Sequence, residues 1–404
     1  LGSSGKTITI PAGATITNSG TAAGFGATGE TSWDTTVKTT GFTAVSGVGY
    51  FVNTTGGAFT VNLPVGSAGA SVALADYTGT FQTNNITITP NGSQKIGGVN
   101  ANAILSTQGQ SVTFVYVDDT EGWVNVLDST SNVTGTTYIT ATGGTPSQDG
   151  DYEIRTFTGP GTFCISGLAT NPLNNVVDYL VIAGGGSGAG GSAGDAQGGG
   201  GGGAGGFRTS ASTYSGPPLA VPAGIPVTVQ GYGVTVGGAG GGSSALGISS
   251  ARGGNGSGGC CTNGTTGGSG GGPKQGPSTT AGNTPPVSPP QGNPSGAAAG
   301  GNRGSGGGGA AFAGSVQNGG CGAPNTITGS NVTRAGGGGG GGAPGNPGGS
   351  GGAGGGGPAG NAGVGGNPAT VNTGSGGGGT GNDLTGGGGT GGSGIVIIRY
   401  KFQN

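Results

Sequence analysis

Long runs of glycine constrain this chain more than any other feature. The runs of four or more consecutive glycines are Gly198–Gly203, Gly306–Gly309, Gly336–Gly342, Gly354–Gly357, Gly376–Gly379 and Gly386–Gly389. Glycine and proline account for 112 and 22 of 404 residues, a third of the chain, and low-complexity disorder becomes usual at about 25–30%. Because glycine loses the most conformational freedom on ordering, an ordered fold needs a compensating interaction.

One ordered solution is a bundle of polyglycine II helices. This left-handed helix has about three residues per turn and no internal hydrogen bonds. Without Cβ atoms, such helices can lie close enough for backbone N–H and C=O groups to bond between neighbours. Collagen would need glycine at every third position, and Gly190–Gly198 breaks that register. The residues alone leave a packed bundle and a disordered segment as alternatives.

Two apolar segments flank the glycine-rich region, Val176–Ala183 and Ile395–Phe402. The second alternates, with Val396, Ile398, Tyr400 and Phe402 on one face and Arg399 and Lys401 on the other. This period of two predicts a half-buried strand. We expect the two segments to pair as a clasp, which would bring the ends of the glycine-rich region together and close it into a domain.

The N-terminal region predicts an all-β module. Short runs of β-branched and aromatic residues alternate there with Gly, Pro, Asn and Ser turns, and helical spacing is almost absent. Trp123 follows a predicted turn, and core packing is preferred for it over a sugar-stacking role. Few large apolar residues are available, which favours association with further copies of the chain.

These patterns divide the chain into four regions. Residues 1–130 form a β-rich module, and 131–150 form a linker. Residues 151–183 together with 395–404 form a β base and clasp, and 184–394 form the glycine-rich region with exposed loops. If the glycine runs pack, the fold is an all-β module followed by a domain of packed polyglycine II helices clasped by strands, with almost no α-helix.

Several strings, in this order along the chain, carry a resemblance to a known family. They are Asp178–Gly186, Gly201–Arg208, Val227–Gly241 and Gly391–Tyr400. Residues 150–404 thereby resemble the glycine-rich C-terminal domain of bacteriophage tail fibres and fibre-tip adhesins, and the block from Phe59 to Val126 looks like a β module of phage fibre and virion-surface proteins. The Pro-rich segment Pro273–Pro294 is longer than a usual loop of that family.

The resemblance implies a polyglycine II sandwich whose loops bind a host cell-surface receptor, either a glycan or an outer-membrane protein. The chain would then be an extracellular virion protein, joined to other tail proteins and forming a homotrimer through residues 1–130, its fibre or stalk module. The loops Arg208–Pro226, Lys274–Asn293 and Ala311–Arg334 are the expected contacts. The candidate receptor-binding residues are Arg208, Tyr214, Tyr232, Lys274, Phe312 and Arg334.

Two other functions remain open on the sequence. The first is a non-adhesive virion decoration fibre or an extracellular filament subunit. The second is an ice-binding protein, because polyglycine II bundles can present flat, regular faces.

The residue inventory argues against other classes of protein. The chain has no histidine, so a Ser-His-Asp or Cys-His site cannot form, and we expect neither an enzyme nor a bound metal or cofactor. Asp118, Asp119 and Glu121 form an acidic cluster, for which a solvated turn is preferred over a calcium or glycosidase site. Charged residues number 13 acidic and 11 basic without a basic block, which argues against nucleic-acid binding. No apolar run approaches the ~20 residues of a membrane span.

The cysteines are Cys164, Cys260, Cys261 and Cys321. A disulfide between adjacent cysteines is strained, so the easier bridge joins Cys321 to one of the pair. We take Cys261–Cys321 as the candidate disulfide.

Overall fold

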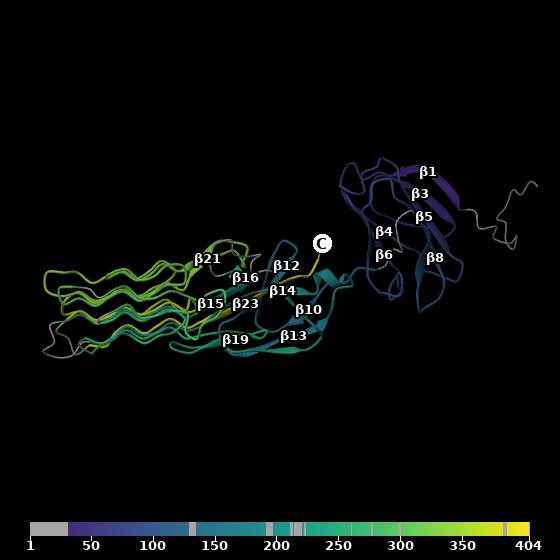
Figure 1. The fold of residues 1–404 in the computed structure, drawn as a ribbon. Coiled ribbons are helices and arrows are strands. Elements are labelled where there is room, and N and C mark those ends of the chain that lie inside the picture. Colours follow the sequence, from purple (N-terminus) through teal and green to yellow (C-terminus); the bar gives the residue numbers. More distant parts are fainter. Residues whose placement is uncertain are drawn as a thin grey trace, which may run out of the picture. The chain divides into compact units, whose positions relative to one another are not determined.

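The computed structural model describes residues 31–128, 135–190, 197–210, 213, 220–221, 224–259, 261–275, 278–297, 300–382 and 386–403. The chain divides into two compact units, Leu1–Thr136 and Thr137–Asn404. Strands dominate the secondary structure (Figure 1), and the described residues contain helix only as 3-10 turns, at η1 (Pro172–Asn174) and at Thr213. The expectation of an all-β fold with almost no helix is confirmed. Within the described part, no helix has the length and apolar character needed to span a bilayer.

The first unit is a pair of β-sheets. Its strands are β1 (Ser32–Lys38), β2 (Phe42–Thr43), β3 (Val48–Val52), β4 (Phe59–Asn62), β5 (Ser71–Asp76), β6 (Ile86–Thr89), β7 (Ala103–Leu105), β8 (Ser111–Tyr116) and β9 (Trp123–Asp128). One sheet has the order β1-β3-β5-β8-β9 and the other has the order β2-β4-β6-β7. Successive strands from β1 to β6 therefore alternate between the sheets, so each turn of the chain adds one parallel strand to each of them.

The core of this unit lies between its two sheets. Val72 and Leu74 from one sheet and Ile86 and Ile88 from the other are completely buried in a single apolar cluster. Trp123 belongs to the same cluster with 0% of its surface exposed, and its ring packs edge-on against Tyr116 at 5.6 Å between centroids. The preference for Trp123 as a core residue is confirmed.

The second unit begins with strands in what was expected to be a linker. Its elements before the glycine-rich body are β10 (Thr140–Thr142), β11 (Thr145–Asp149), β12 (Tyr152–Phe157), β13 (Gly161–Gly167) and β14 (Val176–Ile182). β10 and β11 fall within the linker predicted over residues 131–150. They are ordered as strands because β13 and β12 lie beside them as antiparallel partners, which a Thr-rich segment cannot reveal by itself.

The remaining strands of the second unit are short apart from the last one. They are β15 (Phe207–Ser210), β16 (Ala220–Val221), β17 (Ile225–Pro226), β18 (Gly231–Val234), β19 (Ser243–Ala245), β20 (Ile248–Ser250), β21 (Ala323–Asn325), β22 (Val332–Arg334) and β23 (Ile395–Lys401). The largest sheet has the order β11-β12-β23-β14-β15-β16, with β17 paired to β14.

The predicted clasp is confirmed as an antiparallel pair at the centre of this sheet. β14 pairs with β23 from Val177 opposite Tyr400 to Ile182 opposite Ile395. One face of the pair contributes Tyr179 and Ile398 to one apolar cluster, and the other face contributes Leu180 and Ile397 to a second. Because both faces are covered by apolar side chains, the strands that begin and end the glycine-rich body are anchored in a two-sided core.

The glycine-rich body is held by hydrogen bonds between its runs. Along residues 198–206, every third N–H donates to the same neighbouring segment, at distances of 2.7–3.0 Å. Gly199, Gly202 and Gly205 donate to Thr380, Gly377 and Gly374; Gly200, Gly203 and Gly206 donate to Ser257, Gly254 and Ala251; Gly201 and Ala204 donate to Ser305 and Gly308. Successive N–H groups therefore point to three different neighbours in turn.

The carbonyl groups of the same run accept from three further segments. The donors are Ala183, Gly186 and Ala189 in one segment, Ser269 and Gly272 in a second, and Gly338 and Gly341 in a third. In the described structure this run therefore bonds to six neighbours. Gly336–Gly342 follows the same pattern, because Gly338 and Gly341 donate to 202 and 199 while Gly339 and Gly342 donate to 357 and 360.

Glycine is required inside this arrangement because the neighbouring backbones approach too closely for a side chain. A Cβ atom at Gly201, Gly202 or Gly203 would overlap the carbonyl oxygen of Gly338, Gly186 or Ser269, respectively. The close approach also supplies the interaction that compensates for ordering glycine, since every N–H group and most C=O groups of residues 198–206 find a partner.

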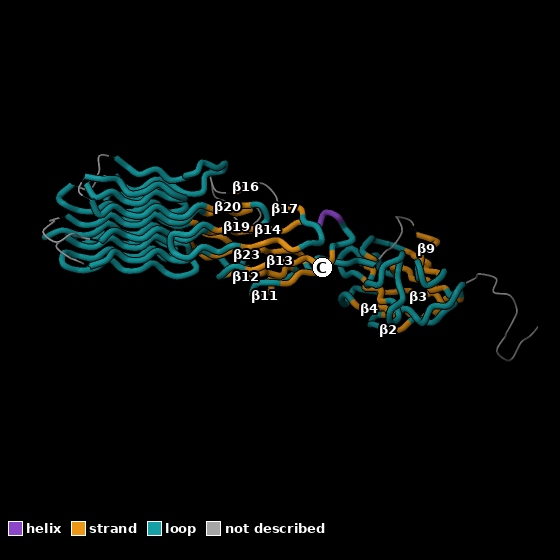
Figure 2. The backbone as a smooth tube through the Cα atoms, turned by 90° about the horizontal axis from the view of Figure 1, so that it is seen from below, coloured by secondary structure: helices purple, strands orange, loops and turns teal. Residues whose placement is uncertain are grey.

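The runs alternate in direction, so their connections alternate between two ends of the body (Figure 2). Residues 183–190 lead away from β14 and 198–206 return to β15. We call the end next to the strands the strand end and the opposite one the far end. The chain therefore visits the far end only at every second connection.

The Pro-rich segment does not form one long exposed loop, contrary to the expectation for Lys274–Asn293. It doubles back within the body, since the N–H of Asn283 donates to Gly268 and the N–H of Phe207 donates to the carbonyl of Gln291. Gln291 is 1% exposed, and its side chain accepts a hydrogen bond from the N–H of Ala251 at 2.8 Å. Part of this segment consequently belongs to the scaffold.

The close packing predicts a sharp difference between two glycines that both lie in runs. A Cβ at Gly339 would overlap the carbonyl oxygen of Gly349, whereas a Cβ at Gly387 would meet no atom within 4 Å. We expect Gly339→Ala to lower the free energy of unfolding by about 1–3 kcal/mol through overpacking. The matched variant Gly387→Ala should leave it unchanged or raise it by at most about 1 kcal/mol. Denaturant unfolding of the second unit measures the free energy of unfolding of both variants. An equal decrease for Gly339→Ala and Gly387→Ala would contradict the packing described here.

The clasp also predicts a specific loss of stability in alkali. The buried Tyr400 hydroxyl donates to Glu153 Oε2 at 2.8 Å, and burial, aided by this carboxylate, raises the pKa of Tyr400 to about 12 from 10.0. The folded protein thus holds this proton more tightly than the unfolded chain, and the resulting stability is present below pH 10 and lost as the pH rises towards 12. Tyr400→Phe should remove about 2–3 kcal/mol of the fall in unfolding free energy between pH 9 and 12. Identical pH profiles for the two proteins in denaturant titrations would contradict this role.

Candidate functional site

The far end carries polar side chains that bond from one connection to the next. Gln197 Nε2 donates to Gln275 Oε1 at 2.7 Å, and Gln275 Nε2 donates to Asn302 Oδ1 at 2.8 Å. These three amides belong to three different connections of the far end. They join the connections laterally, so this surface is held by side chains as well as by the runs beneath it.

A second group of contacts adjoins Asn302. Arg303 Nε donates to the carbonyl of Gly300 at 2.9 Å, and Arg303 Nη1 lies 3.5 Å from Gln317 Oε1. Gln317 Nε2 in turn donates to the carbonyl of Pro347 at 2.6 Å. The half-buried guanidinium of Arg303 is therefore held at the far end in a fixed position, with hydrogen-bond donors left to contact a ligand.

The backbone of the far end is strained at three non-glycine residues. Cys261, Gln275 and Asn302 have φ angles of +63°, +48° and +63°. Asparagine tolerates this left-handed conformation, but glutamine and cysteine adopt it at a cost of order 1–3 kcal/mol. Such a conformation persists where surrounding contacts stabilise it. At Gln275, the side-chain hydrogen bonds with Gln197 and Asn302 provide these contacts. The far end is consequently a surface fixed by side-chain hydrogen bonds, and we take it as the candidate binding site.

Lys274, one of the candidate contacts, lies beneath this surface. Its side chain is 0% exposed, and its Nζ donates to the carbonyl of Gly258 at 3.1 Å. This burial corrects the expectation that Lys274 lies on an exposed loop. The lysine is covered because residues 268–274 form a run inside the body, and its ammonium supports the connection at 258.

The other candidates lie towards the strand end. Arg208 is half-buried in β15, and Tyr232 is half-buried in β18, where its hydroxyl accepts from the N–H of Thr228 at 2.8 Å. Phe312, in the turn after run 304–310, is 66% exposed. Arg334 is half-buried in β22, where burial lowers the pKa of its guanidinium. Tyr214 lies outside the described residues. Of the other five candidates, Lys274 lies beneath the far end and four lie towards the strand end, so the structure does not bring these five together into one surface.

The cysteines do not form the expected bridge. Cys321 and Cys164 have free, exposed thiols, so the Cys261–Cys321 disulfide is wrong for this structure. The two residues are far apart for a topological reason: Cys261 belongs to the far end, whereas Cys321 ends a run that returns to β21 at the strand end.

The acidic cluster of the first unit forms a turn between β8 and β9. Asp118 Oδ1 accepts from the N–H groups of Thr120 and Glu121, both at 2.8 Å, and Asp119 accepts from the Tyr116 hydroxyl at 2.5 Å. These carboxylates are used in closing the turn. In the part of the chain that the structure describes, no group of three His, Cys, Asp or Glu side chains is arranged to hold a metal ion.

Sequence reasoning missed Gln275, Asn302 and Gln317 as possible contacts. Each is a single amide in a region rich in Gly, Ser and Asn, so composition gives no signal for it. Their significance comes from the alternation of the runs, which places them at the same end. Their shared location becomes visible only when the direction of every run is known.

The family model of the glycine-rich domain matches residues 158–401, which begins between β12 and β13 and ends at the last residue of β23. The match thus covers the clasp and the whole glycine-rich body. No curated protein matches the chain.

Proposed function

Since the match spans more than half of its length, the chain belongs to the glycine-rich domain family, and from that premise we propose that it is a bacteriophage tail fibre or fibre-tip adhesin. Its glycine-rich body is the binding part, and it attaches the virion to a host cell-surface receptor. The chain works by binding and not by catalysis.

The observation that carries this proposal is a rigid glycine-rich scaffold with one end built from fixed polar connections. The bonding period of three residues along 198–206 supports the polyglycine II conformation, which has about three residues per turn. Loops held by a rigid scaffold are the usual place for recognition, because little conformational freedom is lost on binding. The far end meets both conditions.

The proposed contacts therefore differ from those expected from the sequence. We assign receptor binding to the described far-end residues Gln275, Asn302 and Gln317, with Arg303 as the cation among them. Arg208, Tyr232 and Arg334 serve the strand end instead. A guanidinium surrounded by amides suits a hydroxyl-rich or anionic surface such as a glycan.

We expect Arg303→Glu to reduce attachment to host cells at least tenfold, because it reverses the charge of the guanidinium that we assign to the receptor contact. Arg252→Glu makes the same change at an exposed arginine of the strand end and should leave attachment unchanged. Binding of fluorescent protein to a panel of bacterial strains measures both variants, with melting temperature as a check on folding.

An equal loss for both variants would contradict the far end as the contact surface. If the unaltered protein binds no strain and labelling places it over the capsid, the adhesin proposal fails in favour of a decoration fibre. Thermal hysteresis in the purified protein would instead support ice binding.

We also propose that the first unit assembles the fibre as a homotrimer. β9 is an edge strand of its sheet, and two adjacent residues within it, Val126 and Leu127, are 55% and 69% exposed. Trp33 on β1, the opposite edge strand, is 41% exposed. Apolar side chains on unpaired edges favour association with another copy.

Light scattering on the purified chain should give three times the 37.0 kDa of one chain. Leu127→Glu should lower that mass, because it places a charge in the apolar contact. Val229→Glu, at a valine of the second unit that is 58% exposed, is the control and should remain trimeric. A monomeric unaltered protein would contradict the proposal.

A further inference from the structure

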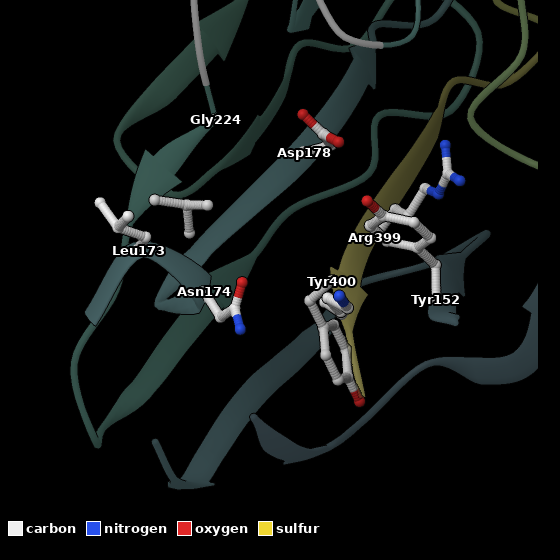
Figure 3. A pocket seen from close by; sticks show the side chains of 9 residues that line it. Tyr152, Leu173, Asn174, Asp178, Gly224, Arg399 and Tyr400 are labelled. Atoms are coloured by element: carbon white, nitrogen blue, oxygen red, sulfur yellow. The ribbon is translucent and has the colours of Figure 1, made fainter. Parts of the chain in front are cut away.

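A cavity of about 240 Å³ lies on the clasp sheet of the second unit, away from the far end (Figure 3). Its lining residues are Tyr152, Leu173, Asn174, Val176, Asp178, Gly224, Arg399, Tyr400 and Lys401. They come from β12, η1, β14 and β23 and from the residue before β17. Segments distant in the sequence thus meet around one opening.

The polarity of the sheet changes abruptly at this cavity. Leu180 and Ile397 are completely buried in an apolar cluster, and Asp178 and Arg399, which are Cα partners, lie two residues further along the same face. Charged side chains here cost desolvation energy that apolar residues would avoid. Stability of the fold alone therefore does not explain why Asp178 and Arg399 occupy these positions.

The two charged groups are held in place before any ligand arrives. The Arg399 guanidinium lies 4.0 Å from the centre of the Tyr152 ring, and its Nη2 lies 3.4 Å from Asp149 Oδ2. Asp178 Oδ1 accepts a hydrogen bond from Ser210 Oγ at 2.8 Å. Such second contacts fix rotamers in binding sites and lower the entropic cost of binding.

The wall of the cavity also holds an unused donor. Arg399 Nε is buried and has no hydrogen-bond partner among the described residues. A buried unpaired donor costs about 1–3 kcal/mol and calls for an explanation beyond packing. A small shift of the side chain on ligand binding would satisfy it.

We propose that this cavity binds one saccharide ring. Sugar hydroxyls donate and accept, and the lining supplies both partners: Asp178 accepts, Arg399 and Lys401 donate, and Asn174 does both. Val176 adds apolar surface for the C–H face of a ring. The volume lies below the roughly 300–1,000 Å³ of pockets for drug-sized ligands, which fits a single ring. This inference does not rest on the adhesin proposal.

The test is saturation-transfer NMR on the full chain with glucose, galactose, mannose, N-acetylglucosamine and glucuronic acid. At least one of these sugars should bind to the unaltered protein, and a preference for glucuronic acid would show that the two cations dominate. Val176→Phe fills the cavity with a residue suited to strands and should weaken binding at least tenfold. Asp178→Asn keeps an acceptor for Ser210 and should also weaken it.

Val229→Phe is the matched control, because Val229 is exposed in the same unit and does not line the cavity. It should bind as the unaltered protein does. Absence of binding by every sugar, or binding that survives Val176→Phe in the folded variant, would overturn the inference. Loss of binding in Arg303→Glu alone would place the sugar at the far end and overturn it as well. Cell attachment is scored separately, so the two proposals can fail independently.

Discussion

Hydrogen bonds between glycine runs are the interaction on which this structure depends. In most domains the backbone bonds locally and side chains fill the core, whereas here the backbone of residues 198–206 reaches six neighbouring segments by itself. In the second unit, the apolar side chains are concentrated at the clasp sheet, where β14 and β23 bury residues on both faces. The body is therefore stabilised by satisfied peptide groups at very short range, and the clasp supplies the hydrophobic contribution that glycine cannot.

This division of roles explains why the body needs its clasp. A single glycine run gains nothing until its neighbours are present, because it has no internal hydrogen bonds and exposes its backbone to water. Neighbours of 198–206 extend in sequence from 183 to 380, so the bundle forms only when distant segments meet. Pairing of Ile182 with Ile395 fixes the two ends of that stretch side by side, which reduces the loop-closure entropy of everything between them.

The clasp and the all-β character could be predicted because they depend on local patterns, such as the alternation in Ile395–Phe402. The position of the candidate site at the far end could not be predicted in this way. Whether a connection reaches the far end depends on how many runs precede it, and non-glycine interruptions obscure that count. Lys274 illustrates the difficulty: a lysine beside prolines reads as an exposed loop residue, yet the run that contains it is covered on all sides and its side chain is 0% exposed.

A polar side chain within the body can also serve as a hydrogen-bond partner for the backbone of neighbouring runs. Ser375 is 0% exposed, its hydroxyl accepts from the N–H of Gly336 at 3.1 Å, and it donates to the carbonyl of Gly354 at 2.7 Å. A serine hydroxyl thus replaces a peptide partner where adjacent runs diverge. Interior positions are then largely restricted to glycine and to small residues such as the buried Ala204 and Ser375. Far-end connections are limited mainly by loop closure, whose cost rises slowly with length. A scaffold built in this way allows its far-end surface to change without a change in its core.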